Sequence, residues 1–156
     1  MKRISLIVGL VILWVSCDKP SVFEEFVSIN GQSWNSNNIL HFNVSMEDSA
    51  QAYNVLLCVR NNGKYEFSNL FLFVTTHSPD GSFLRDTVEI TLADEQGKWL
   101  GKGAASMFTL YHPYRQNIRF PLPGIYTFDI EQAMWIKDLK NISDIGLRIE
   151  KSAERH

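Results

Sequence analysis

Short runs of alternating apolar and polar residues recur along most of this chain. In the clearest runs every second residue is apolar; these cover residues 40–46, 87–92, 117–122, 126–131 and 145–150. Alternation with a period of two turns one row of side chains toward a core and the other toward water, which is typical of a half-buried strand. The segment 53–60 also has a strand pattern, and 67–75 is apolar on both faces, as in a central strand covered on both sides.

Turn-forming residues separate these runs. Combinations of Asn, Asp, Pro and Gly, which favour β-turns, occur at 61–63, 78–81, 94–97 and 123–124. No long segment has the period of an amphipathic helix, and the one helix-like piece, 131–140, is predicted to form one or two turns. The pattern therefore predicts an all-β fold: an antiparallel β-sandwich or jelly-roll-like domain of about eight strands, with one short helical turn near 131–140.

The stretch 89–107 is predicted to be a hairpin. Its tight connection is expected at 94–97, with Gly97 as the residue of positive φ. Trp99 and Leu100 would then point to opposite faces of one strand, so a regular strand could place only one of them in the core. We expect Trp99 to be at least half buried, because its ring removes the most apolar surface from water, and Leu100 to shift between core and rim.

The start of the chain has the features of a bacterial lipoprotein signal. A short basic segment precedes the uncharged apolar run 4–15, whose 12 residues fall short of the roughly 20 needed to span a bilayer. Ser16 and Cys17 then form a lipobox, with Trp14 where Leu is usual. We predict that Cys17 is lipidated and becomes the first mature residue. The alternatives are an ordinary signal peptide that happens to carry a cysteine, disfavoured by the lack of an Ala-x-Ala site, and an uncleaved anchor.

The predicted organisation has four parts: signal peptide 1–16, lipidated tether 17–22, β-sandwich domain 23–151 and C-terminal tail 152–156. Removal of the signal peptide leaves 13 basic against 17 acidic residues, a net charge of −4. A nucleic-acid-binding surface would be basic and clustered, so no nucleic-acid partner is predicted. Two or three acyl chains on Cys17 would hold the domain firmly at a membrane surface.

Cys58 has no disulfide partner if Cys17 carries lipid, although an exported protein meets an oxidising compartment. It lies within the strand-like segment 53–60. We interpret it as a buried, unreactive thiol that packs as a small apolar side chain; a reactive thiol is the alternative.

The sequence shows no catalytic or metal-binding constellation. The histidines are scattered and none stands at metal-ligand spacing; they are His41, His77, His112 and His156. The glycine-rich stretch 97–103 matches no phosphate-binding motif and is interpreted as a bent strand or bulge. Asp129 and Glu131 share a strand face and could form a glycosidase pair, but a solvated face is the preferred interpretation. We therefore predict no enzyme activity and no cofactor.

Several aromatic residues lie near turns or strand ends: Trp34, Trp99, Tyr111, Tyr114 and Trp135. They could form a sugar-stacking platform or a protein-binding patch, and packing in the core or at its rim is the alternative for each. The candidate binding-surface residues are Trp99, Trp135 and Tyr114. Their joint exposure on one curved sheet face would favour carbohydrate binding.

Three segments of the second half give a more specific signal. Residues 86–103 resemble the signature of the gliding-motility lipoprotein H (GldH) family, and 123–134 and 142–151 resemble its closing segments. The resemblance extends over nearly the whole chain and includes Cys17, the one functional position that it transfers. It implies an envelope lipoprotein that works alongside other gliding and secretion-system lipoproteins, with no enzyme activity. Non-gliding relatives carry similar proteins.

The sequence thus predicts a non-catalytic binding or scaffolding component of the gliding motility or associated secretion machinery. It would be anchored through Cys17, have other envelope proteins as partners, and lie in the outer membrane facing the periplasm. The alternative function is a carbohydrate-binding envelope lipoprotein with a glycan as partner. A hydrolase with an unrecognised site is a third hypothesis.

Overall fold

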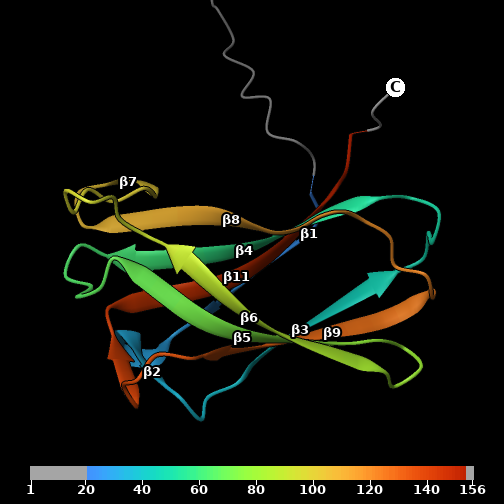
Figure 1. Cartoon of the computed structure of the whole chain (residues 1–156), viewed down its shortest axis with the longest axis horizontal. Coiled ribbons are helices and arrows are strands. Elements are labelled where there is room, and N and C mark those ends of the chain that lie inside the picture. Colours follow the sequence, from blue (N-terminus) through green and yellow to red (C-terminus); the bar gives the residue numbers. More distant parts are fainter. Residues whose placement is uncertain (1–20, 154–156) are drawn as a thin grey trace, which may run out of the picture.

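The computed structural model describes residues 21–153, which form two facing layers of antiparallel strands (Figure 1). The elements in chain order are β1 (Ser21–Ser28), η1 (Asn30–Gln32), β2 (Ser33–Asn35), β3 (Leu40–Met46), β4 (Tyr53–Asn62), β5 (Asn69–His77), β6 (Phe83–Thr91), β7 (Lys102–Ala104), β8 (Met107–Ile118), β9 (Gly124–Gln132), β10 (Asp138–Lys140) and β11 (Ile142–Lys151). The predicted all-β sandwich is confirmed: eight of these strands have seven or more residues, and the other three have three. In this part of the chain no helix is long and apolar enough to cross a membrane.

The two layers have different numbers of strands. One is a five-stranded sheet in the order β1-β11-β4-β8-β7, and the other is a four-stranded sheet in the order β3-β9-β5-β6. The short strands β2 and β10 form a separate pair, which Figure 1 shows at one end of the sandwich. Along one side, β6 of the four-stranded sheet meets β8 of the five-stranded sheet, where Asp86 contacts Tyr114.

The inner faces of the two layers share one apolar core. In β3 every second side chain from Leu40 to Met46 is buried and those between are exposed, as the alternation predicts. The central strand β5 lies between β9 and β6, and its outward-facing Phe73 is covered by the guanidinium of Arg85, 4.5 Å from the ring centre. Trp34 is fully buried, and its indole N–H donates to the Asn38 carbonyl at 2.8 Å, so its polar atom is satisfied.

Strand β11 was expected to turn one face to water, and this is wrong. Gly146 and Arg148 on its outer face are both buried, because β1 pairs with β11 in the same sheet and side chains of β1 lie over them. A Cβ atom on Gly146 would lie 2.8 Å from the Phe26 ring, and Arg148 donates to Glu24 at 2.9 Å. This pairing includes Ser21, which pairs with Glu150.

The predicted helical turn near 131–140 is absent; β9 reaches Gln132, and β10 pairs with β2 after a bent loop. The side chain of Gln132 holds this loop: its amide donates to the Ile136 carbonyl at 2.7 Å and accepts from the Met134 N–H at 2.8 Å. Helical geometry occurs instead in the short turn η1.

The alternating run 117–122 is a loop from residue 119 onward and not the separate strand predicted. Strand β8 ends at Ile118, and Asn117 has a φ of +53°. Phe120 then enters the core, with its ring centre 5.7 Å from that of Tyr53 and 4.8 Å from that of Tyr126. One buried aromatic residue between two exposed neighbours therefore gave the same alternation of apolar and polar residues as a strand.

The predicted hairpin 89–107 forms only close to its turn, where Ala93 pairs with Trp99 in an antiparallel bridge and the Leu100 N–H donates to the Leu92 carbonyl at 2.9 Å. Beyond this short hairpin the chain crosses from one layer to the other. Strand β6 belongs to the four-stranded sheet, whereas β7 pairs with β8 in the five-stranded sheet. The tight turn is nevertheless confirmed: the Gly97 N–H donates to the Asp94 carbonyl at 3.0 Å, and Gly97 has a φ of +79°.

Candidate functional site

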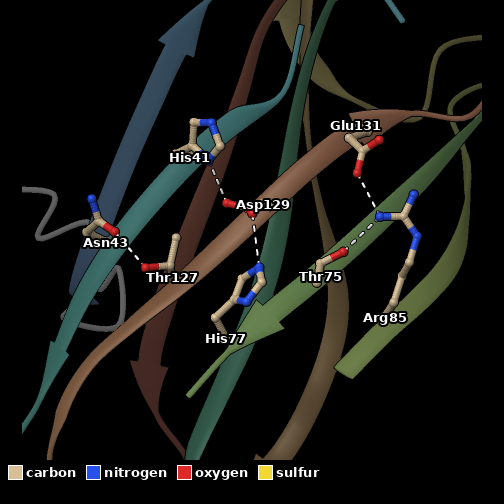
Figure 2. Close-up of polar contacts among 8 residues, drawn as sticks. All are labelled: His41, Asn43, Thr75, His77, Arg85, Thr127, Asp129 and Glu131. Atoms are coloured by element: carbon tan, nitrogen blue, oxygen red, sulfur yellow. Dashed lines mark hydrogen bonds and ion pairs between the residues drawn. The ribbon is translucent and has the colours of Figure 1, made fainter. Parts of the chain in front are cut away.

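The outer face of the four-stranded sheet carries a polar network centred on Asp129 (Figure 2). One carboxylate oxygen lies 2.6 Å from Nδ1 of His41 on β3, and the other lies 3.1 Å from Nε2 of His77 on β5. Strand pairing makes this arrangement, because β9 lies between β3 and β5 and places Asp129 opposite His41 and Thr75. The histidines, scattered in the sequence, are therefore neighbours on the sheet.

A second group extends the same face. Arg85 on β6 donates to Glu131 at 2.7 Å and to the hydroxyl of Thr75 at 2.9 Å, and Thr127 donates to Asn43 at 2.8 Å (Figure 2). Asp129 is paired with two histidines, and Glu131 is paired with Arg85. Both carboxylates therefore belong to a structural network on the outer face of the sheet. Within residues 21–153, no group of three or more His, Cys, Asp or Glu side chains is arranged to hold a metal ion.

A partly buried carboxylate bridges the two layers where β6 meets β8. Asp86 accepts from the Tyr114 hydroxyl at 2.5 Å and from Arg115 at 2.6 Å. Burial acts to raise the pKa of Asp86, but the two hydrogen bonds outweigh it and hold this pKa below its usual value. Burial, and then the hydrogen bond to Asp86, raises the pKa of Tyr114 to about 12. Tyr114 therefore remains a neutral donor at physiological pH and works as a connection between the sheets.

Beside this bridge, an apolar groove of about 240 Å³ opens between the layers. Its floor is made of the buried side chains Val55, Phe120 and Phe128, and its walls include the exposed Phe83 and Leu84. Neither wall residue was among the predicted binding-surface residues. A signal was available, since two adjacent apolar residues on a strand point to opposite faces, so one faces away from the core.

The three predicted binding-surface aromatics have different surroundings. Trp99 is more than half buried, as predicted, with its ring centre 5.8 Å from that of Phe108 and 6.4 Å from that of Tyr65. Trp135, in the loop after β9, is fully exposed, and Tyr114 is partly buried at the bridge. The condition for carbohydrate binding, joint exposure on one curved face, is therefore not met.

Cys58 is buried, as predicted, but outside the core between the layers. It lies on the outward side of β4, between Gly146 of β11 and Tyr111 of β8. Side chains of β1 and β8, among them Phe26 and Tyr111, cover it. Burial, with a smaller contribution from Glu24, raises the pKa of its thiol to about 12. Cys17, the predicted lipidation site, lies outside the described residues.

Exposed apolar side chains gather at both ends of the sandwich. Near the β2–β10 pair these are Ile39, Trp135 and Ile136; a hydrogen bond of 2.8 Å from the Ser36 N–H to the Lys137 carbonyl joins the two loops that carry them. At the other end, near the β5–β6 turn, they are Phe83, Leu84, Leu122 and Ile125.

Comparison with known proteins adds a family to this geometry. The model of the GldH lipoprotein family matches residues 21–149. The gliding motility lipoprotein GldH homolog of Christiangramia forsetii is 36% identical over 149 residues, with 91% of each chain covered. Gliding motility lipoprotein GldH of Flavobacterium johnsoniae is 32% identical over 158 residues, which cover 97% of this chain and 98% of the relative.

A weaker likeness links the chain to a solved structure. Dimeric latent PorU from Porphyromonas gingivalis superposes with a TM-score of 0.33 at 12% identity, covering 88% of this chain and 14% of that chain; at this level the likeness carries no argument. The family match and the two full-length relatives confirm the resemblance seen in the sequence. This chain belongs to the GldH lipoprotein family.

Proposed function

We propose that this protein is a non-catalytic binding or scaffolding component of the gliding motility or associated secretion machinery. Its two relatives carry gliding motility and lipoprotein in their names, which supports a place in the cell envelope. We further propose that Cys17 carries the lipid and that the domain faces the periplasm from the outer membrane. A family named for motility and not for a reaction supports the non-catalytic part.

The observation that carries the binding role is the full exposure of Trp135. Trp135 has a relative exposure of 104%, and Ile136 next to it in the chain and Ile39 in the loop joined to it are each 39% exposed. Exposing an indole to water is unfavourable, and tryptophan is enriched among the residues that dominate protein–protein binding energies. We name the group Ile39, Trp135 and Ile136 the tryptophan patch.

The tryptophan patch favours a protein partner over a glycan. Sugar rings are bound by stacking on aromatic faces, and the neighbours of Trp135 in the patch are aliphatic. Aliphatic side chains around one large aromatic residue suit the apolar centre of a protein interface. The partner would be another envelope protein of the same machinery.

Affinity isolation from crosslinked envelopes of a gliding host tests this role. We expect the tagged wild-type lipoprotein to co-purify with motility or secretion proteins and Trp135→Ala to lose them while keeping its melting temperature. Leu100→Ala is a matched control, because Leu100 is 49% exposed but lies on a different loop. Unchanged recovery of partners with Trp135→Ala would refute the patch as the binding surface. Retention of envelope glycans without any protein partner would support the carbohydrate-binding alternative.

A further inference from the structure

The end of the sandwich opposite the tryptophan patch is also apolar. Phe83, Leu122, Ile125 and Leu84 are 69%, 37%, 61% and 57% exposed, and we name these four residues the apolar end. They come from two segments that touch, since a Cβ atom on Gly124 would lie 3.0 Å from Pro79 in the β5–β6 turn. Phe83 and Leu84 point to opposite faces of β6, so the four side chains surround this end of the sandwich. A group of exposed apolar residues at one place is a candidate interaction surface.

The apolar groove opens at this end. Alternate residues of β6 face the core, and their exposure rises along the strand from Ile90, which is fully buried, to Leu84, which is 57% exposed. The core-facing side of β6 is therefore less covered near Leu84 than near Ile90. The core side chains Val55 and Phe120 form the floor of the groove there. An apolar group entering from outside would extend the core.

The polypeptide enters the domain at the same end. Ser21 at the start of β1 pairs with Glu150, the next residue Lys151 pairs with Tyr53, and Tyr53 pairs with Ile118. Ile118 lines the apolar groove. Strand pairing thus connects the first residue of β1 to the groove across the width of one sheet.

The length of the tether limits what can face this end. Cys17 precedes Ser21 by four residues, which span at most about 14 Å when fully extended. If Cys17 carries the lipid, as the proposed function requires, the start of β1 lies within about that distance of the membrane surface. We propose that the apolar end rests on this membrane, with Phe83 and Ile125 in its interfacial region.

One cationic side chain at this end is placed to meet a lipid phosphate. Arg119 lines the groove and is exposed. Among the described residues it donates a hydrogen bond to the Ala50 carbonyl at 2.9 Å and to no carboxylate. The nearby loop carboxylates Asp48 and Asp80 accept hydrogen bonds from their own loops. The guanidinium of Arg119 is therefore available to a lipid phosphate.

The contact between the apolar end and the membrane, which we name the seat, also orients the tryptophan patch. The apolar end lies at the start of β9, and Trp135 follows the end of the same strand. Nine residues of strand separate the two by roughly 30 Å. The patch would thus be held away from the bilayer, where a protein partner can reach it.

Fluorescent labels on the full-length lipidated protein, reconstituted in phosphatidylethanolamine–phosphatidylglycerol vesicles, test the seat. Phe83→Cys and Ile125→Cys replace exposed residues at the apolar end, and Ile136→Cys is the matched control at the opposite end. Cys58 is buried and does not compete for the label. We expect an environment-sensitive dye at positions 83 and 125 to shift to the blue and to lose intensity with brominated lipids, and the dye at 136 to do neither.

Vesicle flotation separates this proposal from the lipid anchor. If the wild-type protein does not float with vesicles, the anchor at Cys17 fails and the seat fails with it. If the protein floats but the dyes at all three positions remain equally unquenched, the anchor holds and the seat is wrong. If the dye at 83 is unquenched on vesicles but becomes shielded when envelope proteins are added, a protein covers the apolar end and the proposal is overturned.

Discussion

The thiol of Cys58 is covered by side chains of neighbouring strands on the outer face of its sheet. The Phe26 and Tyr111 rings meet edge to face above this region, with centres 6.4 Å apart. We expect thiol reagents to label Cys58 only after denaturation, whereas an Ile136→Cys control reacts in the native state. Cys58→Ala should cost about 1 kcal/mol of unfolding free energy, since it removes one buried atom. Rapid native labelling would show that the covering layer opens.

The raised pKa of Cys58 also sets a pH dependence. The thiol ionises near 9 in the unfolded chain and near 12 in the fold. Because the folded pKa is the higher one, the stabilisation is fully present below pH 9 and is lost as the pH rises from 9 toward 12. The wild-type protein should therefore lose more stability than Cys58→Ala between pH 9 and 11, as measured by urea unfolding.

Trp99 and Trp135 should separate structural from binding roles. Trp99 packs against Phe108 and Tyr65, so Trp99→Ala should lower the unfolding free energy by about 3 kcal/mol. Trp135→Ala should change it by less than about 0.5 kcal/mol, because that side chain is fully exposed. Thermal unfolding of both variants measures this. Equal melting temperatures would mean that Trp99 adds little to the fold.

At the scale of the element, Gly97 tests whether the turn after β6 needs a left-handed residue. A Cβ atom there would meet nothing within 4 Å, so Gly97→Ala should cost about 1 kcal/mol through its φ of +79° alone. Gly63→Ala is the control, because a Cβ atom there would make ordinary contacts and its φ is not positive. Chemical denaturation compares the two; an unchanged midpoint for Gly97→Ala would mean that the turn adopts another conformation.

The same turn shows how far local patterns predict elements. The residues at 94–97 determine a tight turn, and the sequence predicted it together with the positive φ of Gly97. The partners of the flanking strands were not predictable, because they depend on which layer each strand joins. The short hairpin around the turn follows from the local sequence, whereas the pairing of β7 with β8 in the other layer depends on the tertiary structure.

At the scale of the whole molecule, the attachment to the membrane depends on one cysteine outside the described residues. Cys17→Ala should abolish labelling with a palmitate analogue and leave an uncleaved precursor of lower gel mobility, because the lipid-specific peptidase requires the modified cysteine. Cys58→Ala, which keeps the lipobox, should label and mature normally. A Cys17→Ala protein that matures to the wild-type size and stays with the membrane would show that the lipoprotein signal is misidentified.

The sequence alone determined most of the strands with alternating residues, the sandwich class, the tight turn at 94–97 with the positive φ of Gly97, and a family that the comparisons confirm. These features follow from residues that are neighbours in the chain, so their signals are local. Only the tertiary structure decided that His41, Asp129 and His77 meet, that β11 is covered on both faces, and that exposed apolar residues collect at two opposite ends. These features depend on contacts such as the hydrogen bond between Ser28 and Asp144, residues 116 positions apart, and no local period encodes such a pairing.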